Sequence, residues 1–201
     1  MLYFSTKVEI VNDYIDLRYP TISYISFLHL THSSPFFILV AVSHIHIGTN
    51  QGDLLANLQA AIRLLEDKGE VVEKSHIYET EAWGKEDQPN FYNLALTYET
   101  KLDPHDLLRL VNDIEDKMGR VRNEKWSERI IDLDIITYDD KIICDDQLTI
   151  PHLHMAERNF VLIPMMEIAG DWLHPQMDKT IDELYIECHD TCEVILIETE
   201  I

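Results

Sequence analysis

Basic side chains are scarce in this 201-residue sequence. It holds 16 Lys and Arg against 37 Asp and Glu, which gives a formal net charge of -21 at pH 7. A general nucleic-acid binder needs a basic surface to displace counterions from phosphates. The composition therefore argues against nucleic acid and against an anionic membrane surface as partners, and solubility is the simplest interpretation of the charge.

Cysteine, glycine, proline and long apolar runs are also few. The three cysteines, Cys144, Cys188 and Cys192, form no framework of pairs and fit free thiols in a reducing compartment. Six glycines and seven prolines beside 46% hydrophobic residues predict a folded core. The most apolar run, Pro35–Val42, is too short to cross a bilayer. No order typical of a signal peptide opens the chain, so we expect a cytoplasmic protein.

Hydrophobic periodicity predicts a regular α+β domain from residue 37 onward. Strands are expected at 37–47, 71–79, 91–100 and 129–138, and helices at 53–68 and 104–118. The order β-α-β-β-α-β is that of the ferredoxin-like unit, an antiparallel sheet with two helices on one face. A helix over 156–168 and a short element from 181 are expected as a C-terminal helical extension. We expect 37–201 to be a single domain and 1–36 an N-terminal extension without an assigned role.

Two acidic residues, Asp132 and Asp134, alternate with apolar residues in the last predicted strand. Side chains two apart share a face, so the carboxylates are about 6.6 Å apart along the strand. Paired carboxylates in an apolar strand are costly unless a cation neutralises them. Mg²⁺ commonly takes one or two carboxylates together with substrate phosphates. The alternative is a solvated strand face.

A cationic segment precedes the acidic pair. Five of the 16 basic residues lie close together: Lys117, Arg120, Arg122, Lys125 and Arg129. Arginine forks bind phosphate oxygens bidentately, so this segment predicts a polyphosphate site. Trp126 either stacks on a planar base or caps a mobile loop. The alternative is surface arginines paired with neighbouring glutamates. The P-loop and G-x-G-x-x-G motifs are both absent from the sequence.

Aromatic residues and one amide surround the polar segment 80–93. Trp83, Phe91 and Asn93 suit a flat heterocycle with donors and acceptors on its edge, but core aromatics at an edge strand explain them equally well. His152 and Arg158 form a further polar cluster suited to phosphate contact or proton transfer. His44 and His46 alternate in the first strand and are expected to be structural.

Taken together, these motifs resemble the 6-hydroxymethyl-7,8-dihydropterin pyrophosphokinase family. Members move the β,γ-pyrophosphoryl group of ATP onto a pterin alcohol in folate biosynthesis. The resemblance spans about Leu39 to Pro175. It rests on I-G-T-N at 47–50, D-Q-P-x-F-x-N at 87–93, G-R-x-R at 119–122, W-x-x-R-x-x-D-x-D at 126–134, P-H at 151–152 and R-x-F-x-L-x-P at 158–164.

The resemblance implies a monomeric enzyme that uses ATP and two Mg²⁺ ions. Asp132 and Asp134 would bind the metals, and Arg120 and Arg129 would contact the reacting groups. The residues implied for the ATP site are Glu115, Arg122, Trp126, Ile135, Thr149, His152 and Arg158. Those implied for the pterin slot are Gly48, Thr80, Trp83, Phe91, Asn93 and Phe160.

Some positions depart from common family patterns. Glu81–Trp83 stands where many members carry Pro-Pro-Leu, and the loop 122–126 is one residue shorter than in some relatives. Two other functions use the same residues. A phosphohydrolase would employ the aspartates with water as nucleophile, and a non-catalytic ferredoxin-like module would form no AMP and need no magnesium.

Overall fold

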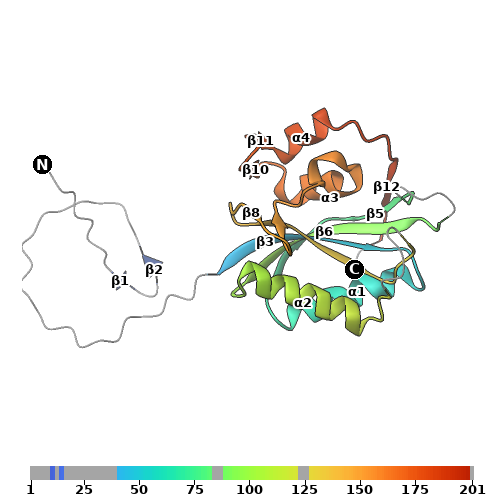
Figure 1. Ribbon diagram of the computed structural model, residues 1–201, viewed down its shortest axis with the longest axis horizontal. Helices are drawn as coiled ribbons and strands as arrows, with labels where there is room; N and C mark the ends of the chain where they lie inside the picture. The colour runs from blue at the N-terminus through green and yellow to red at the C-terminus, as the bar shows by residue number, and fades with distance from the viewer. Residues whose placement is uncertain (1–9, 12–13, 16–39, 83–87, 122–126, 200–201) are drawn as a thin grey trace, which may run out of the picture. The chain divides into compact units, whose positions relative to one another are not determined.

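Figure 1 shows the computed structural model, which describes residues 10–11, 14–15, 40–82, 88–121 and 127–199. The chain divides into two units, residues 1–37 and 38–201. In the first, β1 (Ile10–Val11) pairs antiparallel with β2 (Tyr14–Ile15). The second unit holds the other helices and strands.

An antiparallel sheet forms the centre of the second unit. Its order is β12-β5-β6-β3-β7, and β4 also pairs with β6. The strands are β3 (Ala41–Thr49), β4 (Glu70–Lys74), β5 (Ile77–Thr80), β6 (Phe91–Thr100), β7 (Asp132–Tyr138) and β12 (Val194–Ile197). The single strand expected at 71–79 is divided into β4 and β5 at Ser75, whose Oγ accepts a hydrogen bond from the Ala95 amide. This side-chain bond bridges the break, so both halves run along β6.

Two pairs of helices cover the two faces of the sheet (Figure 1). On one face lie α1 (Leu54–Glu66) and α2 (Pro104–Lys117), which begin at the side-chain caps Asp53 and Asp103. On the other lie α3 (Asn159–Ala169) and α4 (Ile181–Glu187). The α+β ferredoxin-like class is thus confirmed, with the C-terminal extension as a second helical layer.

Short elements connect these layers. They are β8 (Ile143–Cys144), β9 (Thr149–Ile150), the 3₁₀ turn η1 (Met155–Glu157), β10 (Leu173–His174) and β11 (Lys179–Thr180). The helix expected at 156–168 therefore begins later, after Arg158, because the 3₁₀ turn takes up its first residues. None of the helices in the described part of the chain combines the length and apolar character that crossing a membrane requires.

Strand alternation divides the interior into two hydrophobic cores. Ile45 and Ile47 of β3 belong to the core beneath α1 and α2. Ala95 of β6 and Ile136 of β7 belong to the smaller core beneath α3 and α4. Because side chains alternate, the even-numbered residues 44–48 of β3, Asp132, Asp134 and Ile136 of β7, and the odd-numbered residues of β6 face the α3 layer, until a register shift in the β3–β7 pairing puts Thr137 opposite His44.

The C-terminal segment ties α3 to the edge of the sheet. β12 pairs antiparallel with β5, with Val194 opposite Thr80. The Asp190 carboxylate accepts a hydrogen bond from the Asn159 backbone amide at 2.9 Å, and the Asn159 side chain donates to the Asp190 carbonyl at 2.7 Å. The first turn of α3 is therefore held by a segment about 30 residues downstream, at distances typical of hydrogen bonds.

Gly69 allows the α1–β4 turn to pack tightly on β6. A Cβ at Gly69 would lie 2.4 Å from Tyr98 Oη and 2.6 Å from the Glu99 carbonyl oxygen. We expect Gly69→Ala to lower the free energy of unfolding by about 1–3 kcal/mol, measured by urea denaturation. Asp67→Ala, on the exposed end of α1, is the control and should change it by less than about 0.5 kcal/mol. Equal effects of the two substitutions would contradict this packing.

Candidate functional site

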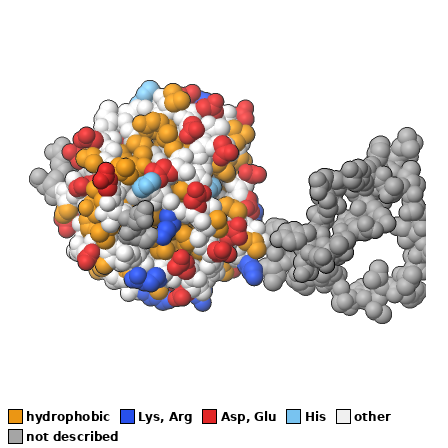
Figure 2. Space-filling view, turned by 180° about the vertical axis from the view of Figure 1, so that it is seen from behind, with side chains coloured by type: hydrophobic (Ala, Val, Ile, Leu, Met, Phe, Trp, Pro, Cys, Tyr) orange, Lys and Arg blue, Asp and Glu red, His pale blue; other side chains and the backbone are white. Residues whose placement is uncertain are grey.

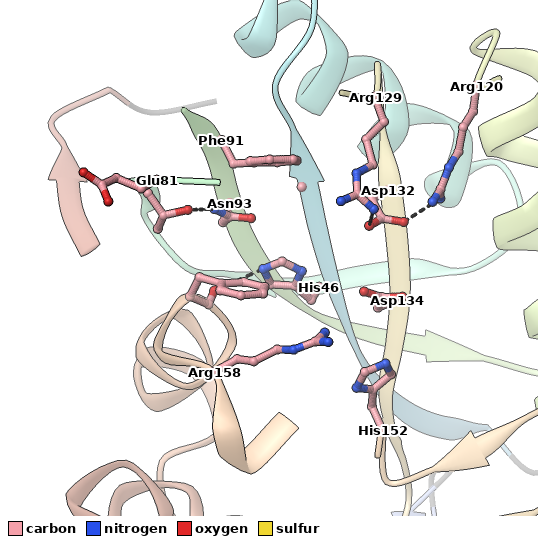
Figure 3. A pocket seen from close by; sticks show the side chains of 13 residues that line it. His46, Glu81, Phe91, Asn93, Arg120, Arg129, Asp132, Asp134, His152 and Arg158 are labelled. Carbon is pink, nitrogen blue, oxygen red and sulfur yellow. Dashed lines mark hydrogen bonds and ion pairs between the residues drawn. The ribbon is translucent and has the colours of Figure 1, made fainter. Parts of the chain in front are cut away.

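Three neighbouring strands provide a polar floor on the α3 side of the sheet. In one row, Gly48 of β3 lies between Asn93 of β6 and Asp132 of β7. In the next row, His46 lies opposite Asp134 of β7. All these side chains share one face, so a strip of apolar β-structure carries an amide, a histidine and two acids side by side (Figure 3).

Gly48 leaves an open space in the middle of this floor. A Cβ at Gly48 would lie 3.0 Å from Asn93 Oδ1, 3.8 Å from His46 Cε1 and 3.8 Å from Phe91 Cδ1. Asn93 is 2% exposed, and its Nδ2 donates to Thr80 Oγ1 at 2.8 Å. That bond orients the amide, so its Oδ1 acceptor lies over Gly48. Gly48 is not among the glycines with positive φ, so the space above it, rather than its backbone conformation, is what the missing side chain provides.

Asp132 binds the arginines of the cationic segment. Its Oδ1 accepts from Arg120 Nη1 at 2.5 Å and its Oδ2 from Arg129 Nη1 at 2.6 Å. The Arg129 guanidinium also lies 5.2 Å from the centre of the Phe91 ring. Its buried Nε donates to no group in the described part of the chain. A buried donor left in this state is costly, and an anionic ligand would satisfy it.

Asp134, unlike Asp132, accepts no hydrogen bond from any described residue. Burial raises the pKa of Asp134 to about 7, and the charge of Asp132 raises it as well, while Arg158 acts in the opposite direction. Arg158, just before α3, extends toward the same place (Figure 3). A carboxylate without donors, beside a second carboxylate, suits a hard divalent cation.

Glu115 and Asn50 hold Arg120 and Arg129 in place through hydrogen bonds. Glu115 of α2 is 2% exposed and accepts from Arg120 Nη1 and, at 2.9 Å, from the Leu133 amide. Asn50 accepts from the Arg129 amide at 2.8 Å and donates to the Pro89 carbonyl at 3.1 Å. Sequence alone did not single out Asn50, because an asparagine after a strand is also an ordinary turn residue.

Two cavities meet at this floor. The first encloses about 240 Å³ and is lined by His46, Gly48, Thr80, Glu81, Phe91, Asn93, Arg120, Arg129, Asp132, Asp134, His152, Arg158 and Phe160. The second, of about 340 Å³, is lined by Leu108, Leu133, Asp134, Ile135, Gln147, Leu148, Thr149, His152, Leu153 and His154. Asp134 and His152 belong to both, so the cavities adjoin at the acidic pair. On the face shown in Figure 2, acidic side chains are scattered over the surface and basic ones are fewer, whereas the first cavity brings three arginines together with three acids.

His152 and His46 are both neutral at pH 7. Burial lowers the pKa of His152 to about 4, and the cationic Arg158 lowers it further. His152 Nδ1 accepts from the His154 amide at 3.3 Å, which leaves Nε2–H as a donor. Burial also lowers the pKa of His46 to about 4. His46 was expected to be structural, yet it lines the first cavity.

The structure brings most of the expected site residues together. Eleven of them line the first cavity, and Ile135 and Thr149 line the second. Glu115 lines neither cavity and acts behind Arg120 instead. Trp83, Arg122 and Trp126 lie outside the described residues. The residues missed by sequence include Leu108 and Gln147, which are ordinary residues of a helix and a turn until the second cavity is seen.

The chemistry of the donor set fits magnesium. The described residues include no cluster of three or more His, Cys, Asp or Glu that could hold a metal by themselves. Asp132 and Asp134 offer a pair of carboxylates that line the first cavity, and Mg²⁺ usually combines one or two carboxylates with phosphate oxygens and water. The pocket is thus suited to a metal that arrives with a polyphosphate.

Fold and pocket define a class: an α+β ferredoxin-like protein with an acidic pair and an arginine clamp beside a heterocycle-sized slot. Residues 44–170 match the family model described as 7,8-dihydro-6-hydroxymethylpterin-pyrophosphokinase (HPPK). The chain therefore belongs to the 7,8-dihydro-6-hydroxymethylpterin-pyrophosphokinase family.

Relatives carry the same family name. The chain is 36% identical over 144 residues to 2-amino-4-hydroxy-6-hydroxymethyldihydropteridine pyrophosphokinase of Aquifex aeolicus, covering 72% of this chain and 90% of that protein. It is 44% identical over 140 residues to the protein of that name from Synechocystis sp., covering 69% and 71%. It is 38% identical to the folic acid synthesis protein FOL1 of Dictyostelium discoideum but spans only 22% of that longer protein.

Solved structures show the same fold at lower identity. A Plasmodium falciparum HPPK-DHPS triple mutant with SDX-DHP superposes with a TM-score of 0.61 at 18% identity. The match covers 76% of this chain and 45% of that chain. This chain thus spans less than half of the Plasmodium protein, and the likeness shows the fold alone.

The buried carboxyl of Asp134 predicts a stability change in the ligand-free protein. The unfolded chain releases this proton near pH 3.8 and the folded protein near pH 7, so stability falls as pH rises through that interval. Asp134→Asn removes that loss and should raise the free energy of unfolding by about 1–3 kcal/mol above neutral pH. Thermal unfolding across this pH range measures it.

Asp132→Asn is the matched control at the neighbouring acid. It removes the charge that pairs with Arg120 and Arg129, so it should lower the free energy of unfolding by about 1–3 kcal/mol. Destabilisation by both substitutions would contradict the different electrostatic environments of the two carboxyls.

Proposed function

We propose that this pyrophosphokinase uses ATP and Mg²⁺ to pyrophosphorylate the hydroxymethyl group of 6-hydroxymethyl-7,8-dihydropterin, with release of AMP. The single observation that carries the proposal is the order of groups across the first cavity. A slot lined by Asn93, Gly48 and two phenylalanines leads directly to an acidic pair between arginines. This order places a flat acceptor and a polyphosphate next to each other.

The slot suits the pterin ring. Phe91 and Phe160 offer aromatic faces, and Gly48 leaves room for close approach. Asn93 Oδ1 accepts from ring N–H groups while Thr80 keeps the amide from turning. From Asn93 to Asp132 the floor spans two strand spacings, about 9–10 Å, which accommodates a bicyclic heterocycle with its substituent toward the acids.

The second cavity suits the adenosine part of ATP. Leu108, Ile135 and Leu148 give it an apolar wall, and Thr149 adds a polar group. Its junction with the first cavity at Asp134 and His152 directs the phosphates toward the arginines. His152, a neutral donor through Nε2–H, contacts phosphate without adding charge.

Positioning and charge neutralisation explain the chemistry that these residues support. Asp132 and Asp134 would hold two magnesium ions, which when bound draw negative charge from the phosphates and lower the pKa of the acceptor hydroxyl. Arg120 and Arg129 exchange part of their contact with Asp132 for hydrogen bonds to the transferred group. There they stabilise the negative charge that spreads over the phosphoryl oxygens during transfer. Glu115 holds Arg120 at the correct place, which is its contribution to the ATP site. Walls on both sides exclude water and keep the reacting atoms in line.

Formation of AMP from ATP, Mg²⁺ and 6-hydroxymethyl-7,8-dihydropterin tests the proposal. Wild-type protein should form AMP only when all three are present. Arg129→Ala should lower kcat by about 100- to 1,000-fold because one preorganised donor to the transition state is lost. Phosphate release from ATP without pterin would support a phosphohydrolase instead, and no AMP under any condition would support a non-catalytic module.

The apolar wall of the second cavity gives a separate prediction. Leu108→Ala should raise the KM for ATP about 3- to 10-fold and leave the KM for pterin unchanged, because one buried apolar contact is lost. Leu110→Ala on the same helix is the control, since Leu110 lines neither cavity. Steady-state kinetics with each substrate varied would separate the two, and a raised KM for pterin alone would place adenine elsewhere.

A further inference from the structure

His46 is the one residue of the pocket floor to which the proposed mechanism gives no task. It is 3% exposed, and its neighbours across the sheet are Ala95 on one side and Asp134 on the other. It is also one residue row from Gly48, over which the acceptor ring would lie. Its imidazole therefore stands between the slot and the acidic pair (Figure 3).

The contacts of His46 determine which ring nitrogen carries hydrogen. Nε2 lies 3.1 Å from the Phe160 carbonyl oxygen, and a carbonyl oxygen only accepts hydrogen bonds. Nε2 is consequently protonated. In a neutral imidazole the other nitrogen, Nδ1, is then an acceptor with a free lone pair.

Nδ1 faces the reacting region. Figure 3 shows Nε2 turned toward α3 and the opposite edge of the ring, with Nδ1, turned toward the β7 aspartates. No described residue donates a hydrogen bond to it. The ring also packs on Phe160, with centroids 5.6 Å apart, so its orientation is restrained from two sides. A fixed acceptor at this place would meet the hydroxyl of a ring seated over Gly48.

We propose that His46 Nδ1 accepts a hydrogen bond from the hydroxymethyl O–H of the acceptor and so aims an oxygen lone pair at the phosphorus. This inference rests on the proposed function. The dihydropterin N5 atom beside that substituent is itself an acceptor, so the O–H is the donor available to Nδ1 there. His46 would thereby select a hydroxylated side chain and restrict its rotation before reaction.

Two substitutions separate this role from a structural one. His46→Gln keeps an N–H donor near the position of Nε2 for the Phe160 carbonyl but removes the acceptor at Nδ1. His46→Asn keeps an oxygen acceptor near Nδ1 but loses the bond to Phe160. We expect His46→Gln to lower kcat about 10- to 100-fold and His46→Asn by less than about 5-fold, given the value of one oriented hydrogen bond.

His44→Gln is the matched control. His44 lies two residues earlier on the same face of β3, binds Thr137 Oγ1 through Nδ1 at 2.6 Å, and lines neither cavity. It should leave kcat and both KM values within about 2-fold of wild type. Thermal unfolding of all three variants checks that each is folded.

Ligand binding gives a readout that a structural role would not move. The dissociation constants of 6-hydroxymethyl- and 6-methyl-7,8-dihydropterin are compared in the presence of Mg²⁺ and a non-hydrolysable ATP analogue. The wild type and His46→Asn should prefer the hydroxymethyl compound about 5- to 10-fold, and His46→Gln should bind both equally. In wild-type protein, the ¹⁵N resonance of His46 Nδ1 should move upfield with the hydroxymethyl compound alone, a measurement that needs no variant.

The outcomes distinguish this inference from the proposed function. A larger loss in His46→Asn than in His46→Gln, an unchanged ligand preference in His46→Gln, or a Nδ1 resonance that ignores the hydroxyl would each overturn the role of Nδ1 while AMP formation by the wild type stands. Absence of AMP with the wild-type protein would overturn the proposed function itself, and this inference with it.

Discussion

The burial of two carboxyl groups on one face of β7 is the constraint on which the rest of the site depends. Asp132 and Asp134 share that face because strand side chains alternate, and the neighbouring residues are committed to the apolar core. Asp132 is neutralised within the protein by Arg120 and Arg129. Asp134 is not, and it keeps its proton to an unusually high pH. The ligand-free pocket therefore holds one acid without a cationic hydrogen-bond partner among the described residues, and the proposed cation with phosphates would neutralise it.

Supporting contacts keep the arginines close to the acids without filling the pocket. Glu115 reaches Arg120 from α2 and also binds the β7 backbone. Asn50 joins the backbone at Arg129 to the segment before β6. Both Glu115 and Asn50 lie outside the lining of the two cavities, so their contacts with Arg120 and Arg129 take up no ligand space. The cations are thus held in place by the scaffold while their remaining donors face the ligand, which is the preorganisation that favours charge stabilisation.

Much of this arrangement could be predicted from sequence where a regular period determines direction. Alternation around Asp132 and helical spacing around Leu107 and Val111 were sufficient for the β-α-β-β-α-β order and for the shared face of the acids. Residues whose meaning depends on distant neighbours could not be found in this way. His46 looks like any buried histidine until β7 and Phe160 of α3 are placed on either side of it. Pairing of β12 with β5 was missed for the same reason, because its partner lies more than 100 residues away.

The division of the interior into two cores has a consequence for partial unfolding of the domain. The slot needs Phe160 and Arg158 from the α3 layer, whereas the contacts among Asp132, Arg120 and Arg129 need only β7, the segment that precedes it and α2. An opening confined to the smaller core would displace Phe160 and Arg158 from the first cavity and leave Asp132 and Asp134 of β7 in place. Amide exchange in α3 should then report this partial opening separately from global unfolding. A ligand that contacts both layers would make them unfold together, as one cooperative unit.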